Sequence, residues 1–178
     1  MLHGIKQVQS IFDALKEKGI AEVKVCFSGG GDEGQIDDIK LIDETGNNIA
    51  GKFTRRWDFN TKTWLPASES FPEMSYIAAD FKGDFVYQAT SDIIEALEDV
   101  GYDLIEWCGV DYYNNDGGYG EIEIKVDTLQ FNMFVCELVY TYEDDTGEFV
   151  EDPSSKQVFG ASGHLLGEET KNEPAVSQ

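Results

Sequence analysis

Cysteine and histidine are scarce in this sequence. Three cysteines (Cys26, Cys108 and Cys136) and two histidines (His3 and His164) occur among its 178 residues. The cysteines are odd in number and have no C-x-x-C spacing, which argues against a disulfide framework and against a zinc knuckle. Each cysteine has apolar neighbours, among which a free cysteine usually behaves as a small buried side chain.

Arrangements that carry catalysis are also missing from the sequence. It contains no Ser-His or Cys-His pattern, and each histidine lies near one end of the chain. Gly29-Gly30-Gly31 is followed by Asp32, where a phosphate-binding loop would need a lysine. We therefore expect no enzyme activity. A hydrolase that uses two carboxylates as acid and base is the weakest of three alternatives.

No apolar run is long enough to span a bilayer, and nothing at the start of the chain resembles a signal peptide. We expect a cytoplasmic protein that does not contact a membrane. Neither a bound cofactor nor a prosthetic group is expected, because no cofactor-binding motif is present.

Positive charge is the most conspicuous shortage. The chain has 13 basic residues against 35 acidic ones, for a net charge of −22. Such a charge keeps a protein soluble and repels nucleic acids and anionic membranes. The partners that it favours are cations and the basic surfaces of other proteins, and direct binding to nucleic acid is excluded first.

Hydrophobic periodicity predicts a helix followed by a hairpin at the start of the chain. Apolar residues recur at helical spacing over residues 3–18, and Gly19 is suited to end that helix. Residues 20–27 then alternate as a strand does. A returning strand is expected to end at the turn over residues 44–48.

A helix followed by a hairpin is expected a second time, later in the chain. Residues 91–107 have helical spacing, with Gly101 as a point where the helix could break. A glycine-rich acidic turn follows, and residues 122–126 and 129–142 then have the pattern of strands. The predicted fold class is α+β, with two helices packed on a mainly antiparallel sheet, and the repeated order is consistent with a duplicated helix-hairpin unit.

Three segments differ in composition. We expect a single acidic α+β domain over residues 1–152, within which residues 51–74 form a long aromatic and basic connection. Residues 153–178 have the composition of a flexible tail, although Phe159, Leu165 and Leu166 could dock part of it. In the connection Arg55, Arg56 and Trp57 form a candidate contact site, because arginine and aromatic residues are enriched at interfaces; the alternative is that its aromatics cap the core.

Acidic residues are concentrated in the second half of the chain. From Asp84 to Asp152 there are nineteen, and Lys125 is the only base. A solvated surface normally mixes both signs, so this excess predicts a face that binds a basic partner protein. The candidate residues of this face lie on the second helix and in the turn after it: Asp92, Glu95, Asp99, Asp111, Asp116, Glu121 and Glu123.

Cation binding is a second alternative. Carboxylates near glycines offer oxygen ligands to a divalent ion, either at Asp32, Glu33, Asp37 and Asp38 or at Asp116, Glu121 and Glu123. Neither run matches the D-x-D-x-D-G pattern of a calcium loop. Whether the acidic turns hold an ion therefore stays open at this point.

Two glycine motifs carry a resemblance to a known family. Gly29-x-Gly31-Asp32-x-Gly34-Gln35-Ile36 and Asn115-Asp116-Gly117-x-Tyr119-Gly120-Glu121 resemble an uncharacterised family of small acidic proteins. Its members occur on bacterial genomes, plasmids and phages. The similarity covers residues 21–42 and 97–142 and does not include the connection. It implies an α+β fold and a mobile-element context, in which a protein of this kind would inhibit a host defence complex by occupying its basic nucleic-acid-binding surface.

Overall fold

The computed structural model of the protein describes residues 5–6, 8–31, 33–79, 85–109, 117–138, 140–142, 149–151 and 157–166. Within them lie the helices α1 (Gln9–Glu17) and α2 (Ile93–Cys108) and the 3-10 helix η1 (Ala50–Lys52). The strands are β1 (Ile5–Lys6), β2 (Ile20–Gly30), β3 (Glu33–Asp43), β4 (Arg56–Asp58), β5 (Thr63–Leu65), β6 (Met74–Ala79), β7 (Phe85–Thr90), β8 (Gly118–Lys125), β9 (Gln130–Glu137), β10 (Tyr140–Tyr142), β11 (Phe149–Glu151) and β12 (Gln157–His164).

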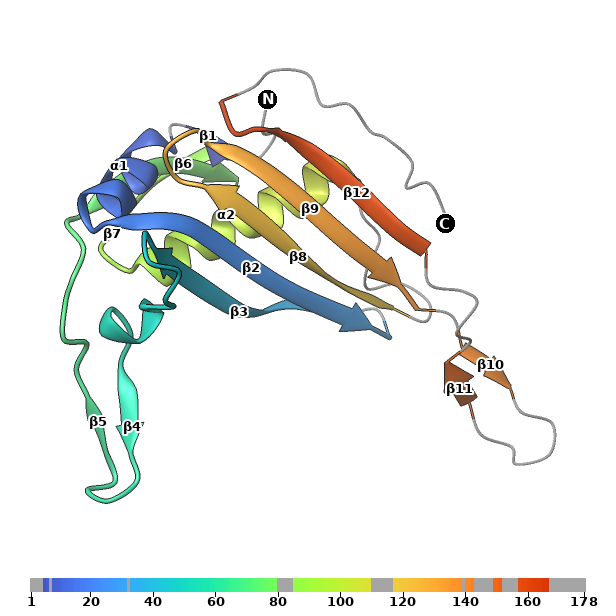
Figure 1. Ribbon diagram of the computed structural model, residues 1–178, viewed down its shortest axis with the longest axis horizontal. Helices are drawn as coiled ribbons and strands as arrows, with labels where there is room; N and C mark the ends of the chain where they lie inside the picture. Colours follow the sequence, from blue (N-terminus) through green and yellow to red (C-terminus); the bar gives the residue numbers. More distant parts are fainter. Residues whose placement is uncertain are drawn as a thin grey trace.

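The main sheet has five strands in the order β12-β9-β8-β2-β3, and every neighbouring pair is antiparallel (Figure 1). Two hairpins, β2–β3 and β8–β9, meet where β2 pairs with β8. Each hairpin follows a helix, as the sequence predicts. The predicted α+β class, with two helices packed on a mainly antiparallel sheet, is confirmed.

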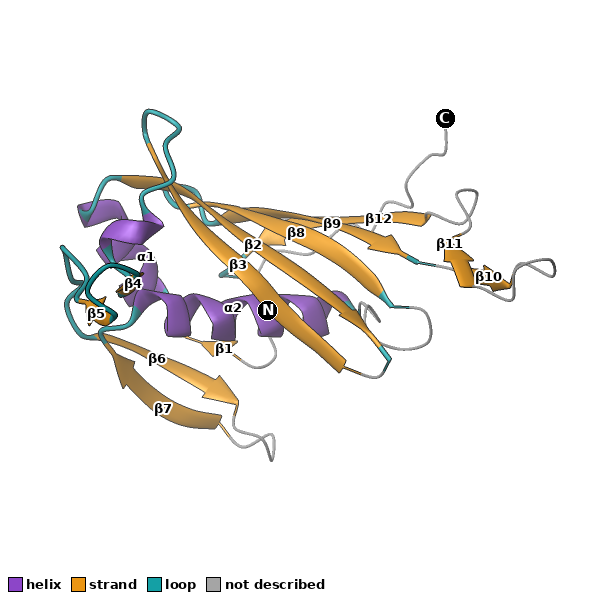
Figure 2. Ribbon diagram, turned by 90° about the horizontal axis from the view of Figure 1, so that it is seen from below, coloured by secondary structure: helices purple, strands orange, loops and turns teal. Residues whose placement is uncertain are grey.

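Helix α2 lies between two sheets. Figure 2 shows it beneath the five-stranded sheet, with the three-stranded sheet β1-β6-β7 on its other side. Val23 and Val25 of β2 and Ile122 and Ile124 of β8 are fully buried, as are Leu97, Val100 and Leu104 of α2. Lys24, Glu121 and Glu123 alternate with these strand residues and lie on the opposite, outer face of the sheet. The two-residue period therefore separates an apolar inner face from a charged outer one.

Gly101 does not break α2. The helix continues to Cys108, and Gly101 is buried against β2 and β3. A Cβ at Gly101 would lie 2.9 Å from Ile36 Cδ1 and 3.0 Å from Val25 Cγ1. The glycine thus lets the helix approach the sheet closely, and this packing offsets its low helix propensity.

The first helix is shorter than predicted. Residues Ile5 and Lys6, expected in the helix, form β1 and pair with Ala78 and Ile77 of β6. Pairing with a distant strand overrides the local helical spacing there. Gly19 ends the helix region with φ of +71°, as expected.

Part of the expected tail belongs to the main sheet. Strand β12 pairs with β9 over its whole length, and Ala161 and Leu165 are buried in the core. The structure thus differs from the predicted flexible tail over residues 157–166, because the edge of β9 and an apolar site for Leu165 order this stretch. Residues 153–156 and 167–178 lie outside the described part of the chain.

The predicted connection over residues 51–74 contains an arm. Strands β4 and β5 form a two-stranded hairpin that projects from the body of the molecule (Figure 1). Phe53 and Phe71 lie at its base with ring centroids 4.5 Å apart, and Phe71 is buried. These two aromatics cap the core, whereas the arm itself is exposed.

Candidate functional site

The two glycine motifs meet at one end of the main sheet. Gly118 of β8 pairs with Gly29 of β2, and Gly117 has φ of +85°. A Cβ at Gly117 would lie 2.7 Å from Gly30 Cα and closer still to the carbonyl oxygen of Gly29. The two backbones can approach this closely only where no side chain intervenes. Asp111 and Asp116, which the sequence places in the intervening turn, lie outside the described residues.

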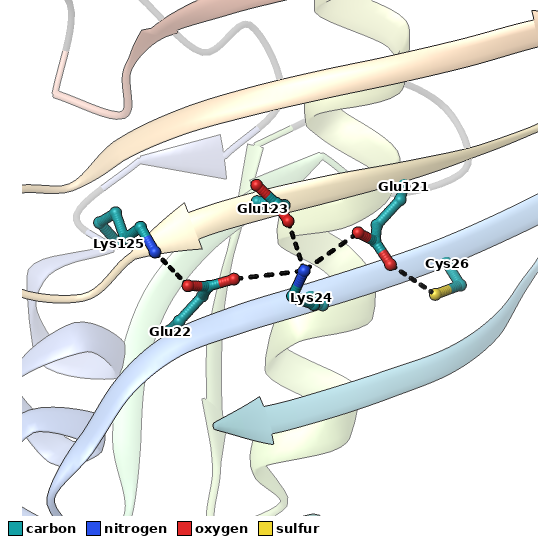
Figure 3. Close-up of polar contacts among 6 residues, drawn as sticks. All are labelled: Glu22, Lys24, Cys26, Glu121, Glu123 and Lys125. Carbon is teal, nitrogen blue, oxygen red and sulfur yellow. Dashed lines mark hydrogen bonds and ion pairs between the residues drawn. The ribbon is translucent and has the colours of Figure 1, made fainter. Parts of the chain in front are cut away.

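Glu121 and Glu123 lie on the outer face of the sheet, where Lys24 bridges them (Figure 3). Lys24 Nζ lies 3.2 Å from Glu121 Oε1 and also donates a hydrogen bond to Glu123. It lies 3.5 Å from Glu22, which in turn pairs with Lys125. Three carboxylates and two ammonium groups leave this cluster with one net negative charge. The carboxylates of Glu121 and Glu123 are therefore already engaged within the protein.

The bonds of this outer-face cluster shift the pKa of its members. The hydrogen bond to Glu123, more than any other contact, raises the pKa of Lys24 above its ordinary value. Burial tends to raise the pKa of Glu22, but the hydrogen bonds and charges of Lys125 and Lys24 together outweigh it and lower the value below 4.5. Both shifts favour the charged forms, so the cluster stabilises the fold near neutral pH.

Replacing Lys24 by methionine is expected to lower the free energy of unfolding by about 1–2 kcal/mol at neutral pH, because the loss leaves Glu121 and Glu123 without a cation in a half-buried site, while Glu22 keeps Lys125. Lys24 contributes, after Lys125, to the depressed pKa of Glu22, so this part of the stabilisation is present above pH 4.5 and is lost as the pH falls through the lower folded-state value. The difference between wild type and variant should accordingly shrink in acid.

Denaturant midpoints near neutral and acidic pH measure this effect. Lys40→Met is the matched control, because Lys40 lies opposite Lys24 on β3 and forms no ion pair within the described residues. Equal losses in the two variants would show that the cluster contributes no specific stabilisation.

The predicted carboxylates on α2 have local structural partners. Asp92 is the N-cap and accepts hydrogen bonds from the backbone N–H groups of Ile94 and Glu95, at 3.0 and 3.4 Å. The Glu95 carboxylate accepts from the hydroxyl of Thr90 at 2.7 Å. Asp99 accepts from the hydroxyl of Tyr76 at 2.7 Å, between the helix and β6. These bonds fix the start of α2 and its position against the small sheet.

A groove lies between the edge of β3 and α2. Its volume is about 360 Å³, near the lower end of ligand-binding sites. We call it the acidic groove; it is lined by Ile36, Asp37, Asp38, Ile39, Asn48, Ala50, Gly51, Thr54, Ile94 and Glu98. Isoleucines from the strand and the helix give it apolar lining, and three carboxylates supply negative charge. Asp37, Asp38 and Glu98 form no ion pair within the described residues.

Glu98 is the electrostatically strained member of this groove. Although Glu98 is exposed, its partial desolvation by the groove raises its pKa above 4.5, and the negative charges of Asp92, Asp99 and Glu95 raise the pKa further. A carboxylate in such surroundings gains most from a cation placed beside it. The groove thus combines apolar lining with unneutralised charge, which suits the aliphatic stem and charged end of a lysine or arginine.

Glu98→Gln should raise the free energy of unfolding at neutral pH by about 0.5 kcal/mol, because it removes a carboxylate that is repelled by its neighbours and is partly screened by solvent. Its raised pKa means that the cost of the charge is present at neutral pH and disappears as the pH falls through the folded-state value, which lies above 4.5. The gain should therefore vanish in acid. Thermal unfolding measured across this range tests it, and a destabilised variant at neutral pH would contradict it.

Arg55, Arg56 and Trp57 lie at the start of the arm and are all exposed. The rings of Trp57 and Trp64 meet edge to face across the hairpin, with centroids 5.5 Å apart. This contact stabilises the hairpin itself. It leaves Trp64 64% exposed and Phe59, at the tip, 83% exposed. The arm is therefore a separate surface of basic and aromatic character, to which the α2 carboxylates do not belong.

The described residues give no support to a metal centre, and two of the three cysteines are poor nucleophiles. No group of three or more histidine, cysteine, aspartate and glutamate side chains is placed to hold an ion among them. Burial raises the pKa of Cys108 to about 11, and burial is also the main cause of the raised pKa of Cys26. Both thiols stay protonated at neutral pH and are weak nucleophiles. Neither α-helix in the described part of the chain has the length and apolar character to cross a membrane.

Comparison with known proteins gives one match. A family model described as a family of unknown function (DUF6878) matches residues 5–52. The matched region runs from β1 through α1, β2 and β3 to η1, so it covers the first glycine motif and one wall of the acidic groove. It does not reach α2 or β8. No curated protein and no solved structure matches the chain.

Sequence reasoning singled out the helix and the second turn but missed how the groove is assembled. From the sequence, Asp37 and Asp38 were named only as candidate ligands of a divalent ion, and Glu98 was not named as a candidate site residue. The available signal was the helical spacing of Glu95, Glu98 and Tyr102, which places them along one side of α2. The opposite wall comes from β3, and its position depends on tertiary packing. The hydrogen bond from the Ile36 N–H to the hydroxyl of Tyr102, at 3.2 Å, joins the two walls.

Proposed function

We propose that this protein is an acidic interaction module that binds a basic segment of another protein in the acidic groove. The observation that carries the proposal is the position of Glu98, an exposed carboxylate that lies at the side of an apolar-lined groove and forms no ion pair within the described residues. A bound lysine or arginine would cover the isoleucines with its stem and neutralise Glu98 with its charged end.

The overall charge supports the same class of partner. A net charge of −22 attracts basic proteins over distances of a Debye length and speeds their association. It also repels nucleic acids. The internal pairing of Glu121 and Glu123 with Lys24 makes the outer face of the sheet a weaker candidate than the groove.

The partner class can be narrowed by the resemblance of the two glycine motifs. In the mobile-element context that it implies, the basic surface would be the nucleic-acid-binding surface of a host defence complex, and the protein would act as its inhibitor. This narrower proposal rests on the charge and the motifs. In it, Asp92 and Glu95 at the start of α2 would extend the acidic surface beyond Glu98.

Salt dependence tests the proposal. The probe is a short synthetic peptide of alternating lysine and valine, with a serine-valine peptide of equal length as the uncharged control. Between ionic strengths of about 0.1 M and 1 M the Debye length falls from about 10 Å to about 3 Å, so the lysine peptide should lose most of its affinity. Fluorescence anisotropy measures both. Equal affinity of the two peptides, or an affinity that salt leaves unchanged, would overturn the proposal.

A further inference from the structure

Strand β3 is an edge of the main sheet. The hydrogen bonds of its backbone N–H and C=O groups show which residues direct these groups away from β2. The N–H of Leu41 donates to Asn48 Oδ1 at 3.3 Å, and the Leu41 carbonyl accepts from the N–H of Ile49 at 2.8 Å. Leu41 therefore directs both backbone groups away from β2. The segment that follows β3 covers the edge at this point.

Ile39 lies two residues before Leu41 and pairs with Val25 of β2. Because hydrogen-bonded and non-hydrogen-bonded pairs alternate along antiparallel strands, the N–H and C=O of Ile39 also face the outer edge. No hydrogen bond to these two groups from a neighbouring segment is found within the described residues. Ile39 lines the acidic groove, and although the residue as a whole is only 6% exposed, its outward donor and acceptor lie on the groove side of the strand.

The edge carries features that restrict what can pair with it. The register shifts between Cys26 and Phe27, so that Asp37 is the extra residue of a bulge. Asp37 and Asp38 directly precede Ile39 on this edge strand, and both are exposed. Inward bulges and charges are ordinary protection against edge-to-edge association, and here they would repel another copy of this acidic edge. The same charges favour a strand that carries lysine or arginine.

We propose that the acidic groove binds its basic ligand as an extended strand, added to the edge of β3 through the backbone of Ile39. This inference rests on the proposed function and specifies the conformation of the partner segment. The bulge at Asp37 limits the regular edge, so the added strand is short. Main-chain hydrogen bonds would supply the affinity that is independent of the ligand's sequence, and the carboxylates would select basic side chains.

Backbone methylation of the probe tests the proposal. In a strand, alternate N–H groups point to opposite sides. Two versions of the lysine-valine peptide, N-methylated on one or the other alternate set of residues, have the same charge. One version should lose affinity about tenfold, because it can no longer donate to Ile39, while the other should bind as the parent does. Amide hydrogen exchange of Ile39 should slow on binding, whereas that of Leu41, already bonded to Asn48, should not change.

The outcomes separate this inference from the function on which it rests. If both methylated peptides bind as the parent does, with the same loss of affinity in high salt, strand addition is overturned and the acidic module stands. Unchanged amide hydrogen exchange at Ile39 in the complex would likewise overturn strand addition and leave the proposed function standing. If no lysine peptide binds more tightly than the serine-valine control, the proposed function fails as well.

Discussion

Replacing Gly117 by alanine is expected to lower the free energy of unfolding by about 4 kcal/mol or more, a loss seen only for changes that break the packing of a fold. The new Cβ would lie 2.7 Å from Gly30 Cα and closer to the oxygen of Gly29. Both are backbone atoms of β2, which pairs with β8. Relief therefore requires β2 and β8 to separate, and a change of side-chain rotamer would not be enough.

Gly46→Ala is the matched control for this prediction. Gly46 also has φ of +85°, but a Cβ there would meet nothing within 4 Å. Its replacement should cost only about 1–2 kcal/mol, the strain of a left-handed alanine. Chemical denaturation of both variants separates backbone strain from the clash. Equal losses would show that the close approach of the two glycine motifs is not important for stability.

This contact also explains why two motifs so far apart in the sequence have similar composition. Gly29 and Gly30 leave room for Gly117, and Gly120 leaves room for the ring of Phe27; a Cβ at Gly120 would lie 2.5 Å from the carbonyl oxygen of Phe134. The glycines were predicted from sequence to form special turns. The structure instead places Gly29 and Gly30 within β2 and Gly118 and Gly120 within β8. Their close approach follows from the pairing of these two strands, which a local pattern does not encode.

Neutralising the acidic groove should reduce the affinity for the lysine-valine peptide about tenfold or more, because it removes all three acidic residues that line the groove, one of which is electrostatically strained. The variant is Asp37→Asn, Asp38→Asn and Glu98→Gln. Isothermal titration calorimetry at low salt gives its affinity and that of the wild type. Binding should also strengthen as the pH rises through the raised pKa of Glu98, since only the ionised carboxylate attracts a cation.

The control variant removes the same number of charges elsewhere: Glu17→Gln, Glu44→Gln and Asp127→Asn. These three carboxylates are exposed and lie outside the groove. Each triple variant removes three of the 35 acidic residues, so the long-range field changes equally. The control should lose no more than about threefold in affinity, because exposed charges that do not line the groove make no direct contact with the ligand and contribute little to its binding. A similar loss in both variants would mean that net charge, and no particular site, attracts the peptide.

Much of the fold could be predicted from local periodicity. The helix α2, the hairpin β2–β3 and the strands β8 and β9 all follow repeating apolar positions that fall on one buried face. Strand β1 could not be predicted, because two residues with helical spacing pair with β6. Strands β6 and β7 were also missed. Strand β12 was hidden by a composition typical of a solvated tail, and the edge of β9 orders it.

Less of the candidate site could be predicted. Glu121 and Glu123 were expected to contact a partner protein. In the structure both carboxylates accept hydrogen bonds from Lys24, which precedes them in the chain by 97 and 99 residues. No local pattern reports such a pairing. The groove was missed for the same reason, since its walls come from β3 and α2. Net charge and the preference for a basic partner could be predicted, because they depend on composition alone.

An NMR titration of the isotopically labelled protein with the lysine-valine peptide tests most directly the claim that the acidic groove is the binding site. The predicted result is that the largest amide shift changes occur at residues 36–39 on β3 and at Ile94 and Glu98 on α2, the two walls of the groove. Shift changes centred instead on the outer-face cluster around Lys24, or on Trp57 and Trp64 of the arm, would contradict the account.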